Sequence, residues 1–128
     1  MSDDLFEKGK QKRTAVLGSE YVSRALDNAD EFSIDFQKYV TESAWGFCWS
    51  DETLDMRTRS LMNLTMIAAL GKMDEFVLHV RGALKNGVTK NELKATIHII
   101  AVYVGVPAGV QAMNHIKEVL KEDSVKNQ

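Results

Sequence analysis

Two stretches of the sequence are apolar around almost the whole circumference of a helix. Residues 61–70 read LMNLTMIAAL, and residues 95–110 read ATIHIIAVYVGVPAGV. A helix that is apolar on all sides must be buried on all sides, and a chain of 128 residues has few elements with which to cover two such helices. The stretches are therefore either central core helices or surfaces shared between subunits. We favour the second interpretation, which predicts a homo-oligomer.

Helical patterns fill most of the remaining chain, and no run alternates for long enough to indicate a strand. The patterns predict an all-α fold in one compact helical domain spanning residues 1–128. The expected helices cover residues 3–17, 20–26, 30–47, 56–70, 74–85, 90–104 and a last helix from about residue 106, with a loop over residues 48–54.

Local signals place the ends of these helices. Asp30 and Asp55 are expected to be N-caps. Gly71 is expected to end or kink its helix, and Gly87 stands where a left-handed residue follows a helix. Thr89 and Glu92 have the spacing of a capping box, and Pro107 suits the first turn of the last helix.

Composition argues against several classes of function. A net charge of -2 does not favour nucleic acid or an anionic membrane surface as a partner. No uncharged apolar run approaches the length of a membrane span. The charged N-terminus does not resemble a signal peptide, so we expect a cytoplasmic protein. The single cysteine, Cys48, excludes a disulfide within the chain and is expected to be a buried, inert thiol.

A group of ionisable residues shares one helical face. Lys72, Glu75 and His79 are spaced so that all three lie on the same side, with Glu75 one turn before His79. A carboxylate beside an imidazole raises the pKa of the histidine and fixes its tautomer, which suits proton transfer near neutral pH. The alternative interpretation is a helix salt bridge with a packed histidine. The histidines show no spacing typical of a metal site.

Four longer segments resemble the carboxymuconolactone decarboxylase family. They are WGFCWS at residues 45–50, LDMRTRSL at 54–61, AALGKMDEFVLHVRGALKNG at 68–87 and AVYVGVPAG at 101–109. The resemblance implies the all-α fold of the alkyl hydroperoxidase D-like type. It also implies a homo-oligomer, since members are often hexamers.

The same resemblance separates two kinds of chemistry. The hydroperoxidase branch has a CxxC motif followed by a histidine, and its cysteine positions fall here on Lys72 and Glu75, while its upstream glutamate falls on Ser60. Without these sulfurs the dithiol peroxidase route is closed. A basic residue and a glutamate at the two positions are typical of the decarboxylase branch.

The activity implied is decarboxylation of 4-carboxymuconolactone to 3-oxoadipate enol-lactone in protocatechuate breakdown, with no cofactor. The partner is thus a small anionic lactone. We expect His79 to donate the proton or to hydrogen-bond the developing oxyanion, with Glu75 orienting the ring. Arg57 is expected to bind a substrate carboxylate, with Arg81 as the second choice. Trp45 and Tyr103 are expected to form pocket walls.

One segment departs from the family pattern. Decarboxylases of the family often read WSRPGLD where this chain reads WSDETLD, so Asp51 stands where a base is common. Two alternatives follow from this departure and from the packed-histidine interpretation. The first alternative is a related cofactor-free enzyme that acts on another lactone or keto acid. The second is a non-catalytic helical oligomer that binds a small ligand.

Overall fold

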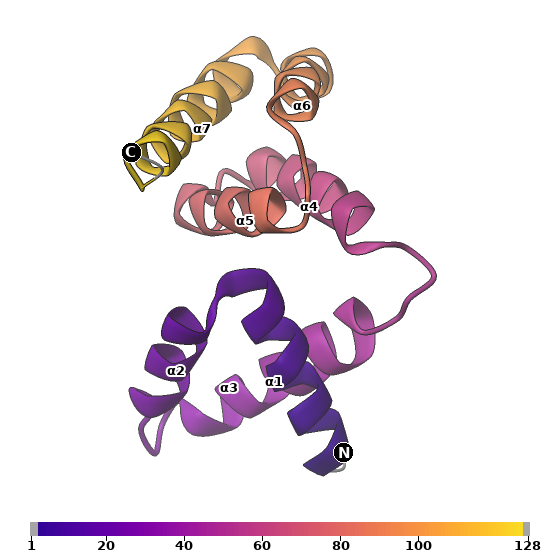
Figure 1. The fold of residues 1–128 in the computed structure, drawn as a ribbon, viewed down its shortest axis with the longest axis vertical. Coiled ribbons are helices and arrows are strands. Elements are labelled where there is room, and N and C mark those ends of the chain that lie inside the picture. The colour runs from indigo at the N-terminus through magenta and orange to yellow at the C-terminus, as the bar shows by residue number, and fades with distance from the viewer. Residues whose placement is uncertain (1–2, 127–128) are drawn as a thin grey trace. The chain divides into compact units, whose positions relative to one another are not determined.

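The computed structural model describes the backbone of residues 3–126 and the side chains of residues 4–122. Its elements are the helices α1 (Asp3–Leu17), α2 (Ser19–Asp27), α3 (Ile34–Val40), η1 (Thr41–Trp49), α4 (Met56–Leu70), α5 (Met73–Lys85), α6 (Lys90–Tyr103) and α7 (Val106–Lys126) (Figure 1). The described residues contain no strand, which confirms the predicted all-α class. The chain forms two compact units, residues 1–56 and 57–128. The one-domain organisation stays a prediction.

Most predicted helix ends are confirmed. Gly71 and Gly87 follow α4 and α5 with positive φ values of 71° and 91°, a region that glycine enters without the clash of a Cβ. The Thr89 side chain accepts a hydrogen bond from the Glu92 amide, and the Glu92 side chain accepts one from the Thr89 amide, which completes the capping box.

The segment between α2 and α4 differs from the prediction. Asp30 does not cap a helix directly: its Oδ1 accepts hydrogen bonds from the backbone amides of Phe32 and Ser33, both at 3.0 Å, in a turn before α3 begins at Ile34. The predicted loop at Cys48 is also wrong at its start, because the wide-turned π-helix η1 continues to Trp49. Cys48 is exposed rather than buried.

In the first unit, α1 crosses η1 with backbone almost touching backbone. A Cβ on Gly9 would lie 2.0 Å from the carbonyl oxygen of Thr41, and one on Gly46 would lie 2.6 Å from that of Leu5. Glycine is therefore required at both positions. Beside this crossing, the guanidinium of buried Arg13 donates to Gln37 Oε1 at 3.1 Å and to Thr41 Oγ1 at 3.3 Å.

In the second unit, residues one or two helical turns apart on each helix build a shared core. The fully buried members include Leu64 on α4, Phe76 and Val80 on α5, Leu93 and Ile100 on α6, and Ala112 and Val119 on α7. Helices α6 and α7 approach closely where a Cβ on Gly109 would lie 2.8 Å from that of Ala101. This core holds in place the elements that carry His79.

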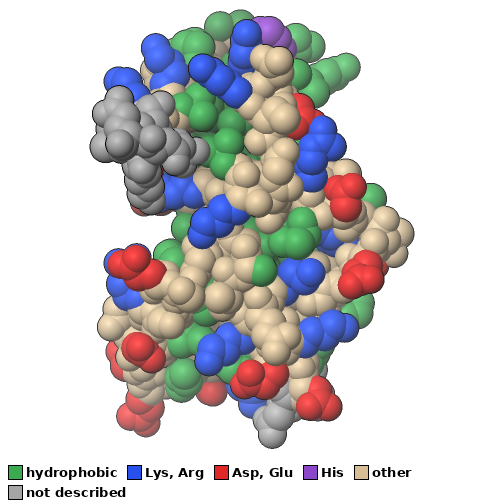
Figure 2. Space-filling view, viewed as in Figure 1, with side chains coloured by type: hydrophobic (Ala, Val, Ile, Leu, Met, Phe, Trp, Pro, Cys, Tyr) green, Lys and Arg blue, Asp and Glu red, His purple; other side chains and the backbone are tan. Residues whose placement is uncertain are grey.

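Both apolar stretches leave one face outside the core of the unit. On α4 the exposed stripe is Met62, Met66 and Leu70, and on α6 and α7 it is Ile99, Val102, Tyr103, Val106, Val110 and Met113. Val102 and Tyr103 are 74% and 84% exposed. Figure 2 shows hydrophobic side chains at the surface of this unit. Within residues 3–126 no helix is both long and apolar enough to cross a membrane.

Candidate active site

His79 lies on α5 and faces α4, where it meets Asn63. The Asn63 side-chain nitrogen Nδ2 is 3.0 Å from Nδ1 of the His79 ring. Both side chains are only partly buried by this contact. An amide nitrogen can only donate, so the ring nitrogen that it faces must accept. Asn63 was not among the residues singled out from the sequence, although it is a polar amide inside the apolar stretch LMNLTMIAAL.

The protonation of His79 differs from the sequence-based expectation. Burial lowers the pKa of His79 from 6.5 to about 4, whereas a neighbouring Glu75 carboxylate was expected to raise it. Glu75 is exposed, and within the described part of the chain it makes no hydrogen bond or ion pair. Burial alone therefore sets the shift, and the ring is neutral at pH 7.

A second polar contact clamps α4 to α5. The Asn86 side chain, at the C-cap of α5, donates to buried Ser60 Oγ at 2.9 Å. Ser60 and Asn63 are one turn apart on α4, so both face α5. These two contacts restrict sliding of one helix along the other and thereby set the position of His79.

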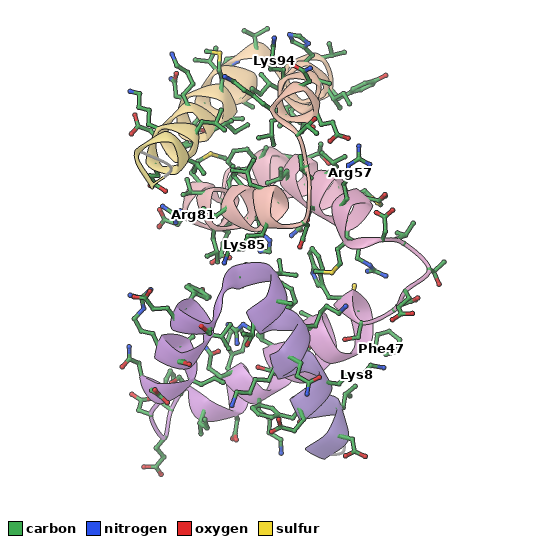
Figure 3. All side chains as sticks on the ribbon, in the orientation of Figure 1. Lys8, Phe47, Arg57, Arg81, Lys85 and Lys94 are labelled. Carbon is green, nitrogen blue, oxygen red and sulfur yellow. The ribbon has the colours of Figure 1, made fainter. Side chains whose placement is uncertain are left out.

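Arg57 and Arg81 are each engaged by a glutamate. Arg57 forms a two-pronged ion pair with Glu92, with Nε 3.2 Å from Oε1. Arg81 pairs with Glu122 through Nε to Oε2 at 3.0 Å and through NH2 to Oε1 at 2.9 Å. Figure 3 places the two arginines on opposite sides of the second unit. They do not converge on one site within it.

The two expected pocket walls occupy different settings. Trp45 belongs to the first unit, where it is 5% exposed and stacks on Trp49 with ring centroids 4.9 Å apart. Tyr103 ends α6 and is 84% exposed, as part of the apolar stripe. In this single chain, Trp45 is thus a core residue and Tyr103 a surface residue.

The departure at Asp51 has a local structural role. Asp51 Oδ1 accepts hydrogen bonds from the Thr53 amide at 2.9 Å and from Thr53 Oγ1 at 2.6 Å. An aspartate that bonds the chain two residues later forms a turn of its own. The Asp51 carboxylate therefore closes a local turn over residues 51–53.

One other place suits the expected chemistry less well. An open depression of about 460 Å³ in the first unit is lined by Asp30, Glu31 and Phe32, whose acidic side chains would repel an anionic substrate. Across residues 3–126 no group of three or more His, Cys, Asp or Glu side chains is arranged to hold a metal ion. His79 and its surroundings on α4 and α5 are the best candidate site.

Comparison with known proteins identifies the family. The chain is 42% identical over 123 residues to 4-carboxymuconolactone decarboxylase of Acinetobacter baylyi, covering 95% of this chain and 92% of that protein. It is 44% identical over 109 residues to the nitrosuccinic acid decarboxylase npaB of Metarhizium robertsii, covering 85% of this chain and 76% of that protein. The family model of the carboxymuconolactone decarboxylases matches residues 35–118, which include His79, and this protein belongs to that family.

Proposed function

We propose that the protein decarboxylates 4-carboxymuconolactone to 3-oxoadipate enol-lactone without a cofactor. The observation that carries the proposal is the 42% identity, over 95% of the chain, to a protein named for this activity. The residues at Lys72, Glu75 and His79 support it, because they follow the decarboxylase branch of the family resemblance rather than the CxxC branch.

The reaction needs a group that stabilises negative charge. When the carbon–carbon bond to the carboxylate breaks, carbon dioxide leaves and the electron pair moves through the ring alkene onto the lactone carbonyl oxygen. A proton then returns to carbon. Hydrogen-bond donors placed where charge develops are usually the largest contribution to catalysis. His79, with a pKa of about 4, is neutral at pH 7 and suits the role of donor to that oxyanion better than the role of acid.

The remaining site residues are proposed in supporting roles. Glu75 lies one turn before His79 on α5 and is proposed to adjust the ring when substrate is bound. Arg57 is proposed to bind a substrate carboxylate, with Arg81 as the second choice, and either arginine must first release its glutamate. Trp45 and Tyr103 are proposed as pocket walls in the assembled protein.

We propose that the protein forms a homo-oligomer, and the family resemblance suggests a hexamer. We also propose that it is located in the cytoplasm. The exposed stripe on α6 and α7 supports association, because large apolar stripes on a helix surface are typical of interfaces. In such an oligomer the exposed Tyr103 side chain would pack against another copy of the chain, where it could form a pocket wall.

A second candidate substrate is nitrosuccinic acid, which the relative from Metarhizium robertsii is named for. Loss of a carboxylate next to a nitro group also moves an electron pair onto oxygen. A neutral donor at His79 would serve either reaction, so the two substrates must be separated by experiment.

The test follows carbon dioxide release by the purified protein from 4-carboxymuconolactone, generated enzymatically in place, and from nitrosuccinic acid in parallel. We expect turnover of the lactone above its spontaneous rate and a loss of at least about a hundredfold in His79→Ala, as for removal of an oxyanion donor. His98→Ala, at an exposed position on α6, is the matched control. A loss of activity of twofold or less in His79→Ala contradicts the role of His79. A kcat/KM that is higher for nitrosuccinic acid than for the lactone would make nitrosuccinic acid the proposed substrate.

A further inference from the structure

The contact between Asn63 and His79 determines which ring nitrogen carries the proton. Asn63 Nδ2 has hydrogens and no lone pair to offer, and it lies 3.0 Å from His79 Nδ1. Nδ1 must therefore present its lone pair. A neutral imidazole with an unprotonated Nδ1 has its proton on Nε2.

We propose that Asn63 is a positioning residue that holds His79 as the neutral tautomer with its proton on Nε2, so that the ring acts as a donor to the oxyanion of the decarboxylation. The role in the reaction rests on the proposed function, whereas the tautomer does not. A carboxylate at Nδ1 would have the opposite effect, since it would draw the proton to Nδ1 and favour a charged ring.

Three features of the unit support this arrangement. The hydrogen bond from Asn86 Nδ2 to Ser60 Oγ, 2.9 Å long, fixes α4 against α5 on the helix faces that also carry Asn63 and His79. Glu75 does not bond the ring in the described part of the chain. Burial lowers the pKa of His79, which keeps the ring neutral. In other enzymes a neutral imidazole is known to polarise a substrate carbonyl group by donating a hydrogen bond to its oxygen.

The chemistry benefits from a neutral donor in a specific way. A hydrogen bond from Nε2 stabilises the oxyanion without transferring its proton, because neutral imidazole is a very weak acid. The electron pair therefore stays delocalised until carbon takes a proton from solvent water. The rate of decarboxylation then depends on whether the ring is oriented so that the Nε2 proton points at the oxyanion.

The test is nitrogen-15 NMR of the histidine rings in the intact protein at pH 7, without substrate. His79→Gln assigns the His79 signals. We expect a pyridine-like Nδ1 and a pyrrole-like Nε2 in the wild type. Asn63→Asp, which keeps the shape but can only accept, is expected to reverse this pattern or to protonate both nitrogens. Asn114→Asp, at an exposed position on α7, is the matched control and leaves the signals unchanged.

Kinetics connect the tautomer to the reaction. Asn63→Asp is expected to lower kcat by at least about tenfold with a smaller change in KM, since wrong-tautomer variants lose transition-state stabilisation. A wild-type ring with its proton on Nδ1, or one charged at pH 7, overturns the proposal, and neither result depends on a variant that folds. The expected wild-type tautomer in a protein that turns over neither substrate supports the positioning role and overturns the proposed function instead.

Discussion

Arg57 and Glu92 form an ion pair that joins the first turn of α4 to the first turn of α6. The same Glu92 carboxylate accepts from the Thr89 amide at 2.8 Å, so it closes the capping box and holds the guanidinium at once. Glu92 is thus fixed by its helix, whereas the Arg57 side chain is 47% exposed. An arginine held in this way can exchange its partner carboxylate for one of a substrate.

This arrangement predicts different effects on binding and on stability. Arg57→Gln is expected to raise KM for the lactone by at least about tenfold, because a bidentate contact to a carboxylate is lost. The free energy of unfolding should fall by at most about 1 kcal/mol, as for other exposed pairs. Steady-state kinetics and urea unfolding measure the two effects. Arg81→Gln is the matched control. If KM rises as much or more in Arg81→Gln than in Arg57→Gln, Arg81 rather than Arg57 binds the substrate carboxylate.

The lowered pKa of His79 predicts that acid destabilises the fold. In the unfolded chain the ring takes up a proton near pH 6.5, but in the folded chain it does so only near pH 4. The unfolded state therefore binds more protons in this window, and stability that is complete above it is lost as pH falls through it. The loss from this ring should be roughly 2 kcal/mol between pH 7 and pH 5.

Urea unfolding at constant protein concentration measures this loss. His79→Gln should have a shallower dependence on pH than the wild type, and His98→Gln should keep the wild-type dependence. Identical slopes in the wild type and His79→Gln would contradict a neutral, partly buried His79.

The crossing of α1 and η1 predicts that Gly9 tolerates no side chain. Gly9→Ala would place a Cβ 2.0 Å from the Thr41 carbonyl oxygen, so the helices must separate. We expect a loss of about 2 kcal/mol, as for other overpacked sites. Thermal unfolding followed by circular dichroism measures it. Lys10→Ala, at the exposed neighbouring position, should change stability by less than about 0.5 kcal/mol.

The apolar stripe on α6 and α7 predicts where copies meet. Val102→Glu places a charge where the wild-type side chain is 74% exposed, so it should leave the isolated chain folded while it weakens association. Sedimentation velocity should show a smaller species for this variant. Lys90→Gln, at the exposed start of α6, is the control with the same change of charge. A wild-type protein that sediments as a monomer at micromolar concentration would exclude the oligomer.

Local sequence predicted the elements of this fold with few errors. The helix from Asp3 to Leu17, the turns at Gly71 and Gly87 and the capping box at Thr89 and Glu92 were all correctly expected. Each depends on residues within one or two turns of chain, and their backbone preferences act without the rest of the molecule. The error at Cys48 falls where α1 packs against a π-helix that no local signal announces. The error at Asp30 arises because its carboxylate closes a turn before α3 begins.

The sequence by itself also determined the family, the helix faces and the position of His79 one turn after Glu75 on α5. Lys72, which was expected on the same helical face, precedes α5 as its N-cap with a non-helical backbone. The tertiary structure decided the partners: Asn63 rather than Glu75 for the ring, Glu92 for Arg57 and Glu122 for Arg81. These contacts join residues far apart in the chain, so spacing along one helix does not reveal them. The tertiary structure also decided the charge of His79, because the pKa of a side chain depends on how far neighbouring helices remove it from water.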